Sequence, residues 1–282
     1  MTKKKKRSNL LLIIAIVAVL GFGGAFAYYA HDYYLWWRDG QAARENAAIA
    51  QDIFQDQMTT INDLVGTVML LETHGHHGEG QGVSVTTMAT AFSTSPLDEA
   101  RARTNNSDIV AYLFIEGTNV SNVVLQGPDN AFYLYRDMFG NHNVNGSLFL
   151  DHRNSPLFDD PNTIIYGHNM NNGTMFHNLR YYMNRDFFEA HPHITVITDD
   201  RVFVYEIFSV FRTGIYFDYI QVDFEEGEFE ALLTEITRRR AYDTGITANA
   251  DDNILILSTC TNVTEDTRIV VAARLMKIVI LD

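Results

Sequence analysis

Eight short apolar runs, separated by turn residues, fill the chain from about residue 109 to its end. They are rich in Val, Ile, Leu, Phe and Tyr, and most are too short to be helices, which is typical of β-strands. The runs are VAYLFIE, NVVLQ, GSLFLD, NTIIYGH, HITVITD, RVFVYEIFSVF, NILILSTC and RIVVAARLMKIVIL. This succession predicts a mainly β domain, either a barrel or a sandwich.

Two helical segments interrupt these strands. One is predicted around residues 175–183 and the other at residues 226–240. In the second, four apolar residues recur at helical spacing and form one face, namely Phe229, Leu232, Leu233 and Ile236. We therefore expect a helix inserted between two late strands.

The N-terminal segment predicts a membrane anchor. Residues 10–30 contain no charged residue, and as a helix these 21 residues span about 31 Å, close to the apolar thickness of a bilayer. The basic residues at 3–7 predict a cytoplasmic N-terminus, and the Tyr and Trp residues at 28–37 predict an aromatic belt at the outer face. The alternative is a cleaved signal peptide, because Ala25-Phe26-Ala27 fits a cleavage site. We expect a single-pass cell-membrane protein with an extracellular body.

Charge is distributed unevenly along the chain. Five of the 21 basic residues lie at 3–7, which leaves 16 basic against 35 acidic residues and a formal net charge of −19 for the remainder. Such a charge argues against nucleic acid as a partner, because it repels phosphates. A hydrophobic fraction of 46% nevertheless supplies enough material for a packed core.

Four regions follow from these patterns: a cytoplasmic basic tail at 1–9, a transmembrane signal-anchor helix at 10–30, a stalk region at 31–108 and the mainly β domain at 109–282. Within the stalk region, helical spacing of apolar residues at 41–71 predicts a helix. The segment HGHHGEGQG follows it at residues 74–82. Its glycines favour a solvated loop, although its three histidines have the chemistry of transition-metal ligands.

Cys260, the single cysteine of the chain, ends one of the apolar runs. It has no partner for an internal disulfide, and in an exported chain this favours a chemical role, although a buried structural cysteine is the alternative. His168 ends another run and follows Gly167, which we interpret as leaving room for a substrate beside the imidazole. An imidazole close to a thiol favours the thiolate and later protonates a leaving amine.

Arg268 begins the last run, eight residues after the cysteine. If the two runs are antiparallel neighbours joined by TNVTEDT, their adjacent ends bring the guanidinium close to the sulfur. A permanent cation there stabilises the oxyanion of a tetrahedral intermediate. The alternative is a surface ion pair with Glu265 or Asp266.

Three blocks of this sequence resemble the class B sortases of Gram-positive bacteria. Residues 115–154 are similar to the family's first barrel strands, NTIIYGHNMNNGTMFHNL to its histidine region, and LSTCT followed by TRIVVAARL to its cysteine and arginine strands. The helix between residues 222 and 251 also fits the class B pattern. One departure is Ile256, which replaces the first Thr of the T-L-x-T-C signature.

The resemblance implies a closed eight-stranded sortase barrel with an N-terminal helical segment, and a cysteine transpeptidase that needs neither cofactor nor metal. Cys260 would attack a Thr carbonyl in a C-terminal sorting motif of a secreted protein, and His168 would protonate the departing amine. A peptidoglycan amine, or a pilin Lys, would then resolve the thioester. Matching local motifs also implies six substrate-binding residues: Asn130, Leu134, Tyr219, Ile220, Ser258 and Thr259.

Two other functions remain open at this stage. A cell-wall cysteine hydrolase would use the same thiol and imidazole with water as the acceptor. A non-catalytic, membrane-tethered binding protein would capture cations with its acidic surface or with the histidines of residues 74–82, and its Cys260 would be unreactive.

Overall fold

The computed structural model describes residues 2–73, 83–88, 95–214, 216–260 and 267–281. The side chains of residues 2–16, 56, 62, 64, 65, 67–73, 87, 88 and 260 lie outside that description. Eight strands, β2 to β9, follow one another in a closed ring in the order β9-β7-β6-β2-β3-β4-β5-β8, because β8 also pairs with β9. Each corresponds to one predicted run, so the predicted eight-stranded barrel is confirmed. Their bounds are β2 (Ile109–Phe114), β3 (Ser121–Leu125), β4 (Leu148–Leu150), β5 (Asn162–His168), β6 (His193–Ile197), β7 (Arg201–Thr213), β8 (Ile254–Cys260) and β9 (Arg268–Leu281).

Strand β9 closes the barrel and also extends beyond it. One of its edges pairs with β7 over residues 268–280, while the other pairs with β8 at residues 270–274. Beyond that point a further strand, β1 (Ser84–Met88), runs parallel to residues 277–281 of β9. The sequence did not predict β1, because SVTTM has only a weak apolar pattern and its pairing depends on the overhang of β9.

Helices and 3₁₀ segments accompany the strands of the barrel. The chain contains α1 (Thr2–Thr73), α2 (Asp98–Thr104), α3 (Arg185–Ala190) and α4 (Glu228–Arg239), and the 3₁₀ segments η1 (Phe132–Tyr135) and η2 (Phe176–Met183). Helix α4 lies between β7 and β8 in the chain and buries the four apolar residues that the sequence placed on one face. The predicted inserted helix is therefore confirmed.

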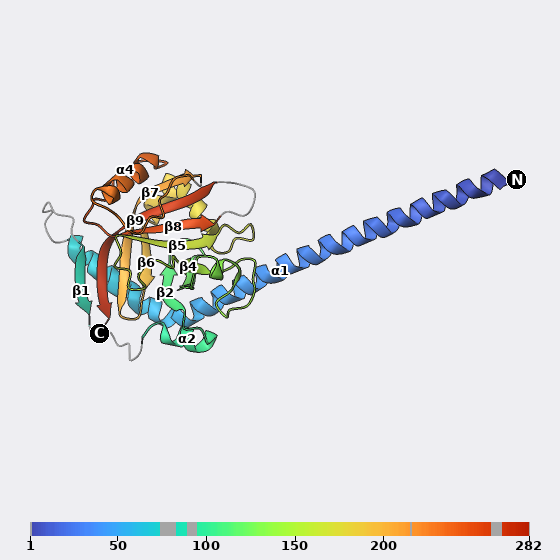
Figure 1. Cartoon of the computed structure of the whole chain (residues 1–282). Coiled ribbons are helices and arrows are strands. Elements are labelled where there is room, and N and C mark those ends of the chain that lie inside the picture. The colour runs from blue at the N-terminus through green and yellow to red at the C-terminus, as the bar shows by residue number, and fades with distance from the viewer. Residues whose placement is uncertain (1, 74–82, 89–94, 215, 261–266, 282) are drawn as a thin grey trace.

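Helix α1 runs without a break through the predicted membrane segment at 10–30 and the helix predicted at 41–71. Its N-terminal part projects away from the barrel, and its C-terminal part runs along it (Figure 1). First contact is made by the buried Asp39, whose Oδ2 accepts a hydrogen bond of 3.1 Å from the backbone of Val144. Further along, Phe54 is fully buried and stacks on Tyr112 with 3.8 Å between ring centroids. This half of α1 is thus part of the hydrophobic core.

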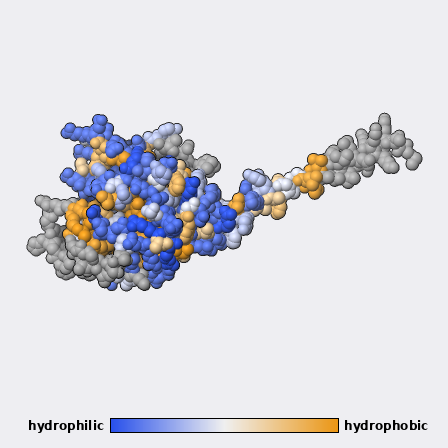
Figure 2. All heavy atoms as spheres, turned by 60° about the horizontal axis from the view of Figure 1, so that its bottom comes forward, coloured by the Kyte–Doolittle hydropathy of each residue, from blue (hydrophilic) through white to orange (hydrophobic). Residues whose placement is uncertain are grey.

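The projecting part of α1 exposes apolar side chains from Val17 onward, among them Phe22 and Phe26 (Figure 2). In the part of the chain that the structure describes, no helix combines the length and the hydropathy that crossing a membrane requires. The structure therefore does not support the transmembrane helix predicted at 10–30, of which residues 10–16 lie outside the described side chains. The loop predicted at 74–82 lies outside the described residues altogether.

Candidate active site

Strand register brings the three predicted catalytic residues to one end of the barrel. In the parallel pair β5 and β8, His168 and Cys260 are register partners at the C-terminal ends of their strands. In the antiparallel pair β8 and β9, Ser258 pairs with Val270, and extending this register by two residues places Cys260 opposite Arg268. The predicted antiparallel pairing is therefore confirmed, and the backbone of Cys260 lies between those of His168 and Arg268. The side chain of Cys260, and the residues Glu265 and Asp266, lie outside the described part.

The His168 imidazole is almost completely buried, with 3% of the residue exposed. Its Nε2 lies 2.8 Å from the carbonyl oxygen of Leu134, and because a carbonyl only accepts, Nε2 carries the hydrogen. Burial lowers the pKa of His168, and the bond to Leu134 opposes that effect only in part. Burial thus favours the neutral ring, in which the hydrogen on Nε2 leaves Nδ1 unprotonated, and Nδ1 has no hydrogen-bond partner among the described residues. It is available to take a proton from a thiol.

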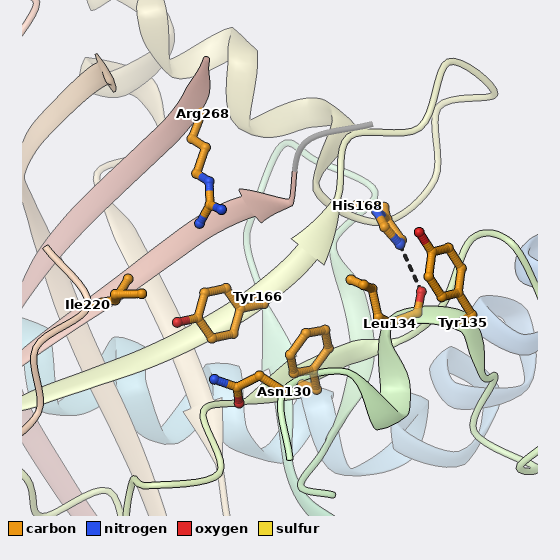
Figure 3. A pocket seen from close by; sticks show the side chains of 8 residues that line it. Asn130, Leu134, Tyr135, Tyr166, His168, Ile220 and Arg268 are labelled. Atoms are coloured by element: carbon orange, nitrogen blue, oxygen red, sulfur yellow. Dashed lines mark hydrogen bonds between the residues drawn. The ribbon is translucent and has the colours of Figure 1, made fainter. Parts of the chain in front are cut away.

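A pocket of about 310 Å³ extends between His168 and Arg268 (Figure 3). Its other lining residues are Asn130, Leu134, Tyr135, Phe149, Tyr166 and Ile220. The walls are mostly apolar, and the polar groups are few and spaced apart, as in sites that bind an extended peptide or another organic ligand. Three of the six predicted substrate-binding residues, Asn130, Leu134 and Ile220, therefore line the pocket.

The other three predicted substrate-binding residues are buried and are not among the residues that line the pocket. Tyr219 is 2% exposed, and its hydroxyl forms a 2.8 Å hydrogen bond with that of the buried Ser258. The Oγ1 of the buried Thr259 accepts a 3.0 Å hydrogen bond from the backbone of Ile269. In the structure Thr259 thus fixes the residue next to Arg268.

The sequence reasoning missed Tyr135, Phe149 and Tyr166 as pocket residues. A signal was present for Tyr166, because it precedes His168 by two positions in a strand and so shares its face. Tyr135 directly follows Leu134, and its ring centroid lies 5.8 Å from that of His168. For Phe149, the sequence around it does not distinguish a pocket residue from an ordinary core residue.

Gly167 serves close packing of the core. A Cβ atom at this position would lie 2.5 Å from Cδ2 of Leu148 and 2.8 Å from Cδ2 of Phe176. Both of these side chains are buried, and Gly167 and His168 are consecutive strand residues that face opposite sides of the sheet. The interpretation of Gly167 as space for a substrate is therefore wrong.

An ionised carboxylate, that of Asp151, lies beneath the pocket with its side chain fully buried. Its Oδ2 accepts hydrogen bonds from Asn130 Nδ2 and Tyr166 Oη, both 2.9 Å long, and Arg153 binds both of its oxygens at 2.7 and 2.8 Å. Burial alone would raise the pKa of Asp151, but these hydrogen bonds outweigh it and lower the pKa to about 2. Sequence reasoning treated Asp151 only as the end of a strand.

The described residues contain no group of three or more His, Cys, Asp or Glu side chains placed to hold a metal ion. The histidines at 74, 76 and 77 lie outside those residues. The site therefore brings together the imidazole of His168, the guanidinium of Arg268 and the backbone of a cysteine, beside a mostly apolar pocket.

Comparison with known proteins agrees with this geometry. The family model for the sortase domain matches residues 113–276. Sortase B of Listeria monocytogenes is 38% identical over 156 residues, which are 55% of this chain and 63% of that protein. Sortase B of Staphylococcus aureus is 34% identical over 176 residues, 61% of this chain and 72% of that protein. The crystal structure of Staphylococcus aureus Sortase B matches with a TM-score of 0.65 at 28% identity, over 84% of this chain and 99% of that one.

Proposed function

The chain belongs to the sortase family, whose members are cysteine transpeptidases, and from this premise we propose that it transfers secreted proteins to an amine of the cell wall. The resemblance to class B sortases is confirmed by the Sortase B relatives. One observation carries the proposal for this chain. The strand register puts the backbone of Cys260 between those of His168 and Arg268, and both of these residues line one pocket, which supports the proposal.

The first half of the proposed reaction forms a thioester. The thiol of Cys260 gives its proton to Nδ1 of His168 as the sulfur attacks the carbonyl carbon of a Thr in the sorting motif. A carbon–sulfur bond forms, and the guanidinium of Arg268 stabilises the negative charge that develops on the carbonyl oxygen. His168 then returns the proton to the departing amine as the carbon–nitrogen bond breaks. Because burial lowers the pKa of His168, it favours a neutral imidazole before the thiol gives up its proton.

The second half transfers the acyl group. An amine attacks the thioester carbon, His168 accepts the proton that this amine loses, and the thiolate leaves and is reprotonated. We propose that the acyl donor is a secreted protein with a C-terminal sorting motif. The acceptor is an amine of the peptidoglycan or its precursor, or a pilin Lys. These assignments are supported by the resemblance to the family.

We propose further that the N-terminal segment anchors the enzyme in the cell membrane, with its catalytic domain outside. The uncharged residues 10–30 follow a cluster of basic residues, and the apolar side chains from Val17 to Phe26 are exposed on the projecting part of α1. Fractionation of cells that express the full chain tests this. Recovery in the membrane fraction after a high-salt wash supports anchoring, and recovery in the medium supports cleavage after residue 27.

Mass spectrometry tests the transpeptidase proposal directly. The full chain is incubated with a library of C-terminal sorting-motif peptides, and Cys260→Ala is the matched control. The expected result is a thioester adduct on Cys260 that an added amine converts to an amide product. Release of acid alone, with the amine ignored, would favour the hydrolase. Absence of any adduct, together with a Cys260 that resists alkylation, would favour the binding protein.

A further inference from the structure

The buried carboxylate of Asp151 forms hydrogen bonds with two residues that line the pocket, Asn130 and Tyr166. We propose that Asp151 is a positioning residue that holds the pocket in shape and sets the direction of its hydrogen bonds toward the acyl donor. This inference rests on the proposed function, because it assigns the pocket to the donor peptide.

The floor of the pocket is held by a single oxygen atom. Oδ2 of Asp151 accepts from Asn130, in the loop before η1, and from Tyr166, in β5. Asn130 is fixed at its other end as well, because its Oδ1 accepts a 2.9 Å hydrogen bond from the backbone of His152. Asn130 and Tyr166, which are distant in the sequence, both line the pocket (Figure 3), and Asp151 binds both.

Arg153 connects Asp151 to the part of the pocket wall that Ile220 forms. Its Nη2 binds Asp151 at 2.7 Å and also donates a 2.8 Å hydrogen bond to the carbonyl oxygen of Ile220, which lines the pocket. The segment around Ile220 is held further by the buried Asn162, which donates to the carbonyl oxygens of Tyr219 and Gln221 at 3.1 and 2.8 Å. Asp151 therefore connects the floor of the pocket with this wall.

The charge of Asp151 also determines what the pocket presents to a ligand. An ionised carboxylate only accepts hydrogen bonds, so Tyr166 must direct its hydroxyl hydrogen toward Asp151. Its phenolic oxygen is then left as an acceptor. Asn130 uses one amide hydrogen on Asp151 and keeps the second available as a donor. Tyr166 and Asn130 thus offer the pocket one acceptor and one donor in a fixed arrangement. A neutral amide at position 151 would not impose this arrangement, because an amide both donates and accepts.

Steady-state kinetics of the full chain test the inference with Asp151→Asn. Asp160→Asn is the matched control, since Asp160 accepts hydrogen bonds from Asn154 and from the backbone of Ser155 in the same loop but contacts no pocket residue through them. Loss of a charged acceptor should raise KM for the donor peptide about tenfold in Asp151→Asn. We expect kcat to change by less than about threefold, because the catalytic groups remain in place. Asp160→Asn should leave both constants unchanged.

A double-mutant cycle tests whether Asp151 acts through Tyr166. Adding Tyr166→Phe to Asp151→Asn should raise KM by much less than the product of the two single effects. Independent effects in this cycle, or equal changes of kcat and KM in Asp151→Asn and Asp160→Asn, would overturn the inference. If Asp151→Asn does not fold, Tyr166→Phe alone tests the floor, and an unchanged KM in that variant would overturn it.

Hydrogen–deuterium exchange separates failure of this inference from failure of the proposed function. If the wild-type chain processes no peptide, the proposed function fails, but exchange still reports on the pocket. Segments 129–135 and 218–222 should exchange faster in Asp151→Asn than in Asp160→Asn. Equal exchange in the two variants would show that Asp151 does not hold the pocket.

Discussion

Replacing Gly167 by Ala should destabilise the barrel without acting on the substrate path. The added methyl group would lie 2.5 and 2.8 Å from side-chain carbons of Leu148 and Phe176, whereas carbon atoms in contact prefer about 3.5–4.0 Å. Overpacking of this kind costs about 1–3 kcal/mol. Ala also reduces the conformational entropy of the unfolded chain, which stabilises the folded state by about 0.4–1 kcal/mol. We expect the free energy of unfolding to fall by about 1–2 kcal/mol.

Urea denaturation of the full chain, followed by fluorescence, measures this change. Leu148→Val provides the decisive control, because it removes the Cδ atom that the new methyl group would contact. The double variant should be about 1 kcal/mol more stable than the sum of the two single effects predicts. A Gly167→Ala protein with wild-type stability but without peptide turnover would refute the reasoning, since the glycine would then clear a path for the substrate.

Three further predictions concern other parts of the structure. Burial lowers the pKa of His168 below its ordinary value of 6.5, so the unfolded chain binds the proton more readily and the free energy of unfolding falls as the pH drops below 6.5. The variant His168→Gln should therefore lose less free energy of unfolding between about pH 7 and 5. Urea titrations at each pH measure this difference. Thr259→Val leaves the backbone N–H of Ile269 without its acceptor and should cost about 1–3 kcal/mol with reduced peptide turnover, whereas Thr259→Ser should retain both. Phe54→Ala should lower the free energy of unfolding by about 3–5 kcal/mol. Gln55→Ala, at an exposed position of the same helix, should lower it by less than about 0.5 kcal/mol. A small effect of Phe54→Ala would mean that α1 is not part of the cooperative core.

The barrel could be predicted from the sequence because each of its strands carries its own signal. Apolar runs such as the one ending at His168 are bounded by turn residues, and the apolar face of α4 repeats at helical spacing. Strand β1 and the short helix α2 carry no such signal, because their conformations depend on tertiary partners. β1 forms where β9 extends past β8, and the N-terminal half of the chain gives no sign of that overhang.

The candidate site was also predictable from the sequence only in part. His168, Cys260 and Arg268 occupy strand ends, and their pairing follows from strand order and register. The network around Asp151 joins residues of neighbouring strands and of a loop, so it exists only once the barrel has closed. Gly167 was misinterpreted for a related reason, because the side chains that exclude a Cβ atom come from β4 and η2 rather than from its own strand.

Strand β1 covers an edge of β9 that β8 does not reach. Where β9 runs beyond β8, its backbone N–H and C=O groups would be unpaired without β1, and such edges recruit strands from other copies and begin aggregation. A chain shortened from its N-terminus past residue 88 would expose this edge and would also lose the core contacts of α1. A shortened form meant for crystals or inhibitor screening should therefore keep β1, even though His168, Cys260 and Arg268 all come later in the chain.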